Sequence, residues 1–451
     1  MLSKIAAIFL MPLYTGVLTT GEYGAMAMIN SCSGIIGLLA NLNIHSGITR
    51  DYFEEGVDRK KLVSTGFFSI LSCSVMIMLI FMMTRHSWTE MLGLQSYGFA
   101  FIIMLLDLPT VSLQSYFAIL TRYKNKPIMF VIGTVSQMMI QIGLSVYLVL
   151  VRQIGVEGIF VATLLANLYG TVFFIIVNWE FIAFTFDKEM LRKALVYAIP
   201  TLPAVLAWWI DTSLGQVLIG KYVSYDVLGV YSVALSITSV FSLITIAFGN
   251  VWGPYLFENY KKEGFVKEVK RLYNLFFMLM MIISVNLSLL ANEVVLILAK
   301  PTYIDAVKYI TLLCYPLSIL MLMPFVTSGI QISRKTKYIS YANCIGSAIN
   351  LLLLVVFLPH YGVIVAPLSL AASRLICFLI SRYYSNRTLN LELPAVWMFV
   401  FMGIVAVCYV INSINLPRIM VWSGLFITDV FVALFFIRQF KSVNLIGMLK
   451  K

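Results

Sequence analysis

The sequence predicts an all-α integral membrane protein that crosses the bilayer about 14 times. Of its 451 residues, 61% are hydrophobic and only 12% are charged, whereas soluble domains are about 45–50% apolar and about 25% charged. Long apolar stretches follow one another with short connections, and each is close to the roughly 20 residues that a helix needs to cross a bilayer. Lysine and arginine are concentrated in every second connection, as in a chain that crosses a membrane repeatedly.

The predicted spans follow the apolar stretches in chain order. They cover residues 2–18, 24–48, 62–83, 97–120, 127–151, 156–178, 194–219, 227–249, 272–298, 306–331, 338–358, 361–381, 394–411 and 419–437. The longest connection has about 20 residues, so no large extramembrane domain is expected.

The distribution of basic residues predicts the orientation. Of 32 lysines and arginines, 25 fall on one side of the spans, six on the other, and one, Arg374, inside a span. Because cytoplasmic loops retain basic residues, the rich side is the cytoplasm, and both termini lie there. The net charge of +12 then reports orientation, and no nucleic-acid partner is expected. Two cytoplasmic stretches, 187–196 and 259–271, are either interfacial helices on anionic lipid or solvated connectors.

The second half of the chain echoes the first at an offset of roughly 205–211 residues. Tyr23-Gly24 recurs as Leu228-Gly229, and the basic turn 122–126 recurs as 334–337. Six spans per repeat is an even number, so both repeats insert with the same orientation. The predicted organisation is a six-helix lobe over 1–186, a second over 187–386, and two further helices with a tail over 387–451.

Motifs of enzymes and of metal sites are missing from the sequence. It contains no HExxH, no GxSxG, no paired carboxylates on one helix face and no glycine-rich phosphate loop. The six cysteines follow no disulfide or metal-ligand spacing. We therefore expect neither catalysis nor a metal nor a cofactor.

Polar residues form stripes on four of the predicted spans, at steps of three or four residues. Since a lipid-facing surface needs only apolar residues, such stripes mark helix contacts or a water-filled cavity. We interpret them as a polar cavity; tight packing of small residues is the alternative, and it accounts for the glycines. The stripes are Asn30, Gly34, Gly37, Asn41, His45 and Thr49; Asp107, Thr110, Gln114 and Thr121; Thr134, Gln137, Gln141 and Ser145; and Thr201, Ala204, Trp208, Asp211 and Gly215.

Charged residues inside spans are the stronger functional signal. A charge at the centre of a membrane helix costs about 2.5–3.5 kcal/mol on insertion scales. Arg374 and Asp107 carry this cost, and Asp211 and Asp429 carry part of it. The functional interpretation is a cavity that binds an anion or relays protons; the structural one is an ion pair or a residue that reaches the interface. Arg50 stands at the cytoplasmic end of the second span.

Several short motifs resemble the Wzx-type oligosaccharide flippases of the multidrug/oligosaccharidyl-lipid/polysaccharide exporter superfamily. The resemblance extends over nearly the whole chain, with one departure: the first span is short, which predicts that the start of its helix is missing. The motifs are Pro12-Leu13-Tyr14-Thr15 with Glu22-Tyr23-Gly24, Thr49-Arg50-Asp51-Tyr52-Phe53, Ala198-Ile199-Pro200 with Pro203, and Gly229-Val230-Tyr231-Ser232-Val233-Ala234.

The resemblance implies two lobes that open alternately to each side of the bacterial inner membrane. The cargo would be an undecaprenyl-pyrophosphate-linked oligosaccharide, delivered for O-antigen, capsule or other surface polysaccharide. The glycan polymerase and the chain-length machinery are candidate partners, beside membrane lipids. A pyrophosphate needs cations and sugars need hydroxyl or amide groups, so the candidate substrate-binding residues are Arg50, Arg374, Asn41, His45, Gln137 and Gln141.

Asp107 and Asp211 are candidates for proton or ion coupling. They also keep open an ion-coupled exporter of drugs or metabolites in the same superfamily, which would need an acidic cavity. A lipid II flippase is a third possibility. A membrane-embedded glycan polymerase is disfavoured by the short loops, and a structural scaffold by the charges inside spans.

Overall fold

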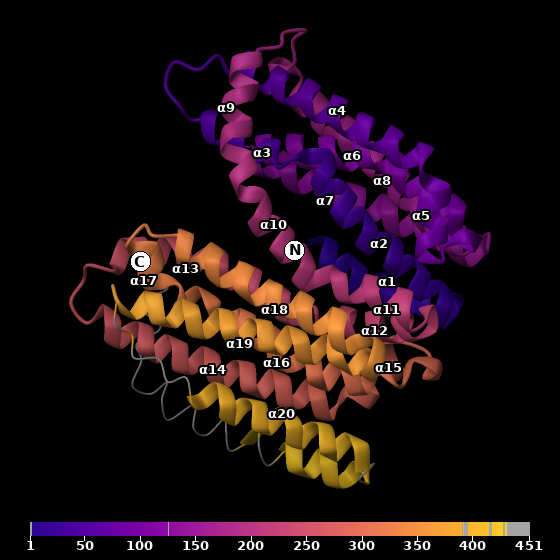
Figure 1. Cartoon of the computed structure of the whole chain (residues 1–451), viewed down its shortest axis with the longest axis vertical. Coiled ribbons are helices and arrows are strands. Elements are labelled where there is room, and N and C mark those ends of the chain that lie inside the picture. The colour runs from indigo at the N-terminus through magenta and orange to yellow at the C-terminus, as the bar shows by residue number, and fades with distance from the viewer. Residues whose placement is uncertain are drawn as a thin grey trace. The chain divides into compact units, whose positions relative to one another are not determined.

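Helices make up nearly all of the regular structure. The structure, a computed structural model, describes residues 2–124, 126–389, 391, 396–414, 417–426 and 429–430, with side chains from Phe9 onward. Every regular element in these residues is a helix and none is a strand, which confirms the predicted all-α fold class (Figure 1).

The helices group into two compact units. The first comprises Met1–Ser232 and Leu351–Val365, and the second comprises Val233–Asn350 and Ala366–Lys451. These units are defined by internal contacts, whereas the predicted boundary between 186 and 187 marks the start of a sequence repeat. The three predicted domains therefore stay a prediction.

The first unit is built from α1 to α11, the start of α12 and residues 351–365. A six-residue π-helix, Val146–Val151, extends α7, and a five-residue one, Ile210–Leu214, joins α10 to α11. The elements are α1 Leu2–Val17, α2 Thr20–Asn41, α3 Ile44–Asp51, α4 Arg59–Met83, α5 Arg85–Leu92, α6 Gly98–Tyr123, α7 Pro127–Ser145, α8 Val156–Val177, α9 Lys188–Ala198, α10 Leu202–Trp209, α11 Gly215–Tyr222 and α12 Tyr225–Thr238.

The remaining helices lie in the second unit, except that the part of α18 (Lys337–Tyr361) from Leu351 onward belongs to the first. A turn of 3-10 helix, Gly362–Ile364, joins α18 to α19. Gly362 adopts a positive φ of 70° there, a conformation that glycine accepts without strain. The elements are α13 Val240–Asn259, α14 Phe265–Leu289, α15 Ala291–Leu298, α16 Ala306–Val326, α17 Ser328–Ile332, α18 Lys337–Tyr361, α19 Val365–Asn386 and α20 Val396–Ile414.

Eleven helical segments of the described chain are long and apolar enough to cross a membrane. They account for most of the predicted spans, and three differences explain the lower number. At 16 residues, α1 is short for a span, and α18 and α19 form one continuous segment, Lys337–Asn386, that contains two predicted spans. The predicted span 419–437 lies mostly outside the described residues, as does the basic tail from 441. The helix content agrees with about 14 crossings.

One predicted span is divided in two. The sequence predicts a single helix over 24–48, whereas α2 ends at Asn41 and α3 starts at Ile44. Leu42 and Asn43 both have positive φ, of 45° and 52°, which asparagine tolerates better than other non-glycine residues. The side-chain amide of Asn43 donates to Thr201 Oγ1 at 2.7 Å, so a tertiary contact stabilises the break. The predicted polar stripe is therefore interrupted after Asn41, and His45 lies on a separate helix.

Capping side chains place the starts of several helices. Thr19 and Glu22 form a reciprocal capping box at the start of α2. The Asp187 carboxylate accepts from two backbone N–H groups at the start of α9 and pairs with Lys61 Nζ at 3.0 Å. The hydrogen bond from Lys61 and the backbone donors lower the pKa of Asp187. The linker between α8 and α9 is thereby attached to the start of α4.

Two glycines allow α2 and the first turns of α12 to touch backbone to backbone. A Cβ at Gly24 would overlap the carbonyl oxygen of Tyr225, and one at Gly229 would overlap that of Thr20. The Thr20 hydroxyl also donates to the Asp226 carboxylate. The two segments in contact are those that the sequence repeat pairs, 205 residues apart, and small residues are what close helix approach in membranes requires.

The largest fully buried side chains of both units are mostly aromatic. In the first, Tyr116 is 1% exposed and its hydroxyl donates to the carbonyl of Val63 at 3.0 Å. In the second, the Trp252 ring centroid lies 4.5 Å from that of Phe325, and the indole N–H of Trp252 donates to the carbonyl of Pro324 at 3.1 Å.

The two predicted cytoplasmic stretches differ in structure. The stretch 187–196 forms most of α9. No separate helix forms over 259–271, because α13 ends at Asn259 and α14 begins at Phe265.

Candidate functional site: a polar network inside the first unit

Three helices of the first unit bring polar side chains together at the depth of the membrane. Helix α8 packs along both α6 and α7. Asp107 and Gln114 lie two turns apart on α6, so they project from the same face. Gln137 on α7 and Asn167 on α8 face them.

Hydrogen bonds join these four side chains into one chain that ends on a carboxylate. Gln114 Nε2 donates to Gln137 Oε1, and Gln137 Nε2 donates to Asn167 Oδ1 at 2.8 Å. Asn167 Nδ2 then donates to Asp107 Oδ2 at 2.7 Å. The hydroxyl of Thr110 donates to the other carboxylate oxygen. We call these five side chains the Asp107 network.

The direction of the bonds favours a negative charge on Asp107. Gln137 and Asn167 each accept at the amide oxygen and donate onward from the amide nitrogen toward the carboxylate. Successive bonds of this kind polarise one another, and a donor to an ionised acceptor makes a stronger bond than one to a neutral acceptor. The network thus offsets part of the cost of placing a carboxylate within the membrane.

Close helix packing makes room for the network. A Cβ at Gly170 would lie 2.9 Å from Gln137 Oε1 and 3.2 Å from Gln114 Nε2, so a larger residue would displace the two amides. One residue further on, the Thr171 hydroxyl donates to the carbonyl of Thr110 at 2.8 Å. This second link between α8 and α6 aligns Asn167 with Asp107.

Two further polar contacts continue along α7 from the network. Gln141 Nε2 donates to Thr163 Oγ1 of α8 at 3.3 Å. Beyond it, the Tyr14 hydroxyl of α1 donates to Ser145 Oγ at 3.0 Å. The predicted stripe on this helix is therefore satisfied by neighbouring helices of the same unit rather than left facing lipid.

Other candidate residues of the first unit lie outside the Asp107 network. Arg50 is exposed at the end of α3, with its guanidinium carbon 4.9 Å from the Tyr197 ring centroid. Asn41 ends α2 and His45 lies in the first turn of α3, and both are half-buried. Asp211 is 8% exposed in the π-helical segment Ile210–Leu214. Their roles in binding or coupling stay predictions.

Arg374 belongs to the second unit. It lies in the middle of α19 and is 8% exposed, so the structure places this charge inside a long apolar helix, as the sequence predicts. Its role in binding stays a prediction.

The sequence interpretation missed Asn167 and Thr163. Together with Thr171 they recur at steps of four on α8, so they form a polar stripe of the same kind as those on α6 and α7. The apolar residues of α8 concealed this signal, because its mean hydropathy of 2.2 is among the highest of the candidate spans.

The network has the chemistry of a proton site or of a site for a single small cation. It offers one carboxylate with amide and hydroxyl oxygens, and a carboxylate exchanges a proton reversibly. In the described part of the chain no three histidine, cysteine, aspartate or glutamate residues converge on a common point.

Comparison with solved structures identifies the fold. An inward-facing multidrug resistance MATE family transporter of the MOP superfamily superposes with a TM-score of 0.70 at 14% identity, covering 86% of this chain and 95% of that one. The lipid II flippase MurJ in an inward closed conformation gives 0.68 at 13% identity, covering 91% and 96%. A MOP superfamily transporter from Pyrococcus furiosus, whose binding pocket has reversed polarity, gives 0.55 at 15%, covering 86% and 94%.

Taken with the apolar helices, these matches define a multi-pass membrane protein with the fold of the MOP superfamily transporters. A sequence comparison with curated proteins gave no match. The sequence model of the family described as "Polysaccharide biosynthesis protein" matches residues 15–308, more than half of the chain. The chain belongs to this family, and the resemblance drawn from its motifs is confirmed.

Proposed function

We propose that this protein is a flippase that moves undecaprenyl-pyrophosphate-linked oligosaccharide units across the bacterial inner membrane for surface polysaccharide synthesis. The observation that carries the proposal is the combination of a polysaccharide biosynthesis family with a transporter fold. Because lipid-linked sugars are assembled on one side of a membrane and used on the other, a member of such a family with a transporter fold suits this step. The lipid II flippase of the same fold is a precedent for a lipid-linked sugar as cargo.

Two features of the chain support an anionic, sugar-bearing cargo. Arg374 is buried within a span and Arg50 stands at a helix end, and guanidinium groups bind phosphate through paired hydrogen bonds. The amides of Asn41, Gln137 and Gln141 suit sugar hydroxyls.

We also propose the orientation and the partners. The basic loops indicate that both termini lie in the cytoplasm. The polymerase and chain-length machinery of the same polysaccharide are the proposed partners.

The Asp107 network supports a proposed role in coupling. Protonation of Asp107 would replace its anionic acceptor by a neutral one and weaken the bond from Asn167 Nδ2. Since Asn167 and Thr171 link α8 to α6, the proton content of Asp107 would change how tightly the two helices are held. Asp211 is a second candidate for this role.

Replacement of Arg374 by alanine tests the proposal. In a strain that lacks the native gene, we expect the wild-type protein to restore surface glycan and Arg374→Ala to abolish it at an equal membrane level, because the cation for the pyrophosphate is gone. The matched control is Arg85→Ala, an exposed arginine in α5, which should restore glycan fully. Normal glycan with Arg374→Ala would remove Arg374 from the mechanism, and no glycan with the wild type would contradict the proposed function.

An ion-coupled exporter is the second candidate. The observations that favour it are the match to a multidrug resistance transporter and the intramembrane carboxylate Asp107. An exporter of cationic compounds would need an acidic cavity, whereas a pyrophosphate needs a cationic one. The sign of the cavity's potential therefore separates the two functions.

A further inference from the structure

An apolar groove runs between α18 and α19 in the second unit. Its volume is about 550 Å³, and Cys344 and Ile345 of α18 line it together with Leu379 and Ile380 of α19. Ile345 is 47% exposed, so the groove opens on the surface of the unit. By the charge of the loops at 334–337 and 382–387, this end of both helices faces the cytoplasm.

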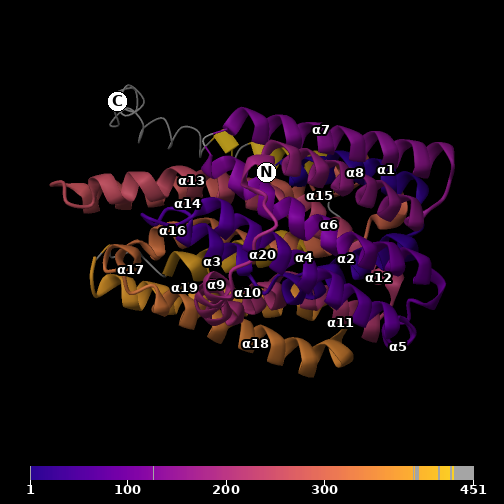
Figure 2. The ribbon, with the colours of Figure 1, turned by 90° about the horizontal axis from the view of Figure 1, so that it is seen from above.

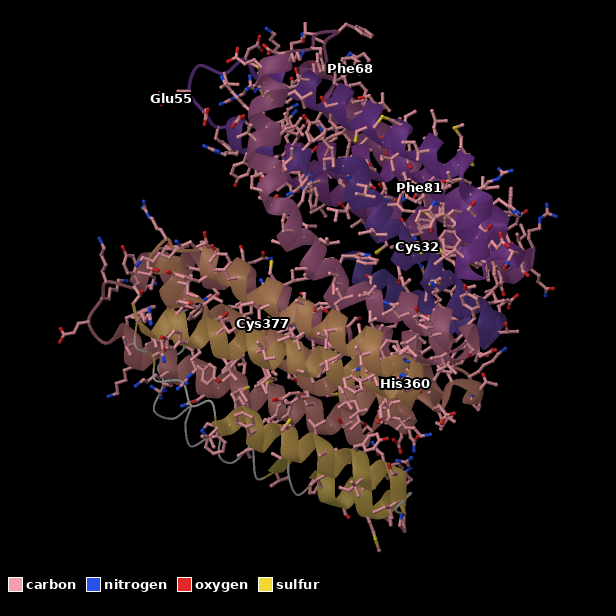
Figure 3. The ribbon with its side chains drawn as sticks, viewed as in Figure 1. Cys32, Glu55, Phe68, Phe81, His360 and Cys377 are labelled. Carbon is pink, nitrogen blue, oxygen red and sulfur yellow. The ribbon has the colours of Figure 1, made fainter. Side chains whose placement is uncertain are left out.

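Close contact between the two helices forms one end of the groove. A Cβ at Gly346 would overlap Cys377 Sγ and lie 2.9 Å from the carbonyl of Ser373. The Cys377 thiol donates to the carbonyl of Ala342 at 3.1 Å. The helices run side by side in both ribbon views (Figures 1 and 2), and Figure 3 labels Cys377 on this pair. Beyond this contact, the side chains that line the groove do not fill the space between the two helices.

Two cations flank the other end, on a stack of tyrosines. Tyr384, which lines the groove, stacks on Tyr338 with centroids 4.0 Å apart and planes at 10°. Lys337 Nζ lies 5.5 Å from the Tyr338 centroid, and Arg387 Cζ lies 5.7 Å from that of Tyr384. Arg387 also donates to the hydroxyl of Tyr383. Both cations are exposed, so their remaining N–H donors are accessible to a ligand.

We infer that this groove binds the polyprenyl chain of a lipid pyrophosphate, with Lys337 and Arg387 on its pyrophosphate. The inference rests on the proposed function and names where the cargo lipid docks on the cytoplasmic side. An apolar groove that ends between two cations matches an amphiphile with an apolar chain and an anionic head. Its volume lies within the roughly 300–1,000 Å³ of ligand sites, which accommodates part of a long chain while the rest stays in the bilayer.

Cys344 provides a direct readout because it lies in the groove wall. The purified full-length protein is treated with a maleimide, and labelling at each cysteine is followed by mass spectrometry. We expect undecaprenyl pyrophosphate to slow labelling of Cys344 and leave Cys73 of the first unit unaffected. Arg387→Gln should raise the concentration needed for protection about tenfold, the effect of losing one charge-assisted hydrogen bond of about 1.5 kcal/mol.

Two comparison lipids identify the ligand. Undecaprenol, which has no charged head, should protect Cys344 only at a higher concentration, and phosphatidylglycerol should not protect it at the concentration at which the pyrophosphate does. Equal protection by phosphatidylglycerol would show a general lipid contact and overturn the inference. So would unchanged labelling with undecaprenyl pyrophosphate.

Filling the groove separates this inference from the proposed function. Ile345→Trp should occupy the groove and reduce surface glycan, whereas Leu352→Trp, at a 59% exposed position of α18 outside the groove, should not. Arg387→Gln gives a second variant at an exposed site if the first lowers the protein level. If the wild type, Ile345→Trp and Arg387→Gln all restore glycan equally, the inferred lipid site is wrong, while the proposed flippase function is supported. If the wild type restores no glycan, the proposed flippase function is wrong. The labelling of Cys344 then still tests whether the groove binds the lipid.

Discussion

Asn167 connects the two ends of the Asp107 network, because its oxygen accepts from Gln137 and its nitrogen donates to Asp107. Its side chain is 8% exposed, so water does not readily replace either bond. Removal of Asn167 leaves both an amide donor and a carboxylate without their partner in the membrane, where an unsatisfied polar group is costly. At the scale of single residues, Asn167 therefore carries the connection between α6, α7 and α8.

A double-mutant cycle tests this connection. We expect Asn167→Ala and Gln137→Ala to destabilise the protein in a non-additive way, with a coupling energy of about 0.6–1.7 kcal/mol, the range for hydrogen bonds between membrane helices. The measurement is the free energy of unfolding in detergent. Asn167→Ala paired with Ser136→Ala, on α7 outside the network, provides the control and should be additive. Additive effects for the Asn167 and Gln137 pair would show that the bond contributes nothing.

At the scale of elements, several helices depart from regular α geometry at positions that carry polar residues. Asp211 lies in a π-helical segment, and another π-helix extends α7 directly after Ser145. The break after Asn41 separates α2 from α3. Such irregularities are tolerated within a membrane where neighbouring groups satisfy the freed backbone atoms, and π-bulges occur frequently at functional sites. These positions are where we expect the helices to bend during transport.

The close contact of α2 with α12 makes a prediction at this scale. Gly24→Ala should lower the free energy of unfolding by about 1–3 kcal/mol, the usual cost of overpacking, because the new methyl group overlaps the Tyr225 carbonyl. The matched control is Gly37→Ala in the same helix, where a Cβ meets no atom within 4 Å, and it should be neutral or stabilising because alanine favours the helix. Thermal unfolding in detergent measures both. Equal midpoints for the two variants would contradict the close contact.

At the scale of the whole molecule, sequence repeat and charge pattern agree with each other. The basic turns 122–126 and 334–337 occupy equivalent places in the two repeats and carry the same charge. Repeats of the same orientation occur in one group of transporters that work by alternating access. A cargo with a pyrophosphate head would require its binding cavity to have a positive potential.

Charged thiol reagents test the sign of that potential. Cysteines placed at Asn41 and Gln141, in a protein whose six native cysteines are replaced, should react faster with a negatively charged reagent than with a positively charged one of equal size. The reason is that a cationic cavity concentrates anions. A cysteine at Glu55 in the exposed loop after α3 (Figure 3) corrects for intrinsic reactivity. Faster reaction with the cationic reagent at both half-buried positions would favour the exporter.

Local sequence signals predicted the elements of this protein well. Most apolar stretches of span length became helices. Two of the polar stripes marked Asp107, Gln114 and Gln137, which the structure joins in one network. These signals succeed because a residue that faces lipid must be apolar, so each exception along a span reports a contact within the protein.

The contacts between helices could not be predicted from the sequence. The donors to Asp107 come from positions 3 and 60 residues away, and the stripe that contains Asn167 was hidden in the apolar α8. The groove between α18 and α19 likewise depends on how closely Gly346 approaches Cys377. By itself, the sequence determined the membrane class, most of the spans and the family resemblance, and it predicted the orientation, since these follow from local composition and spacing. Only the tertiary structure decided which polar groups pair and where space remains, because pairing depends on the geometry of packed helices.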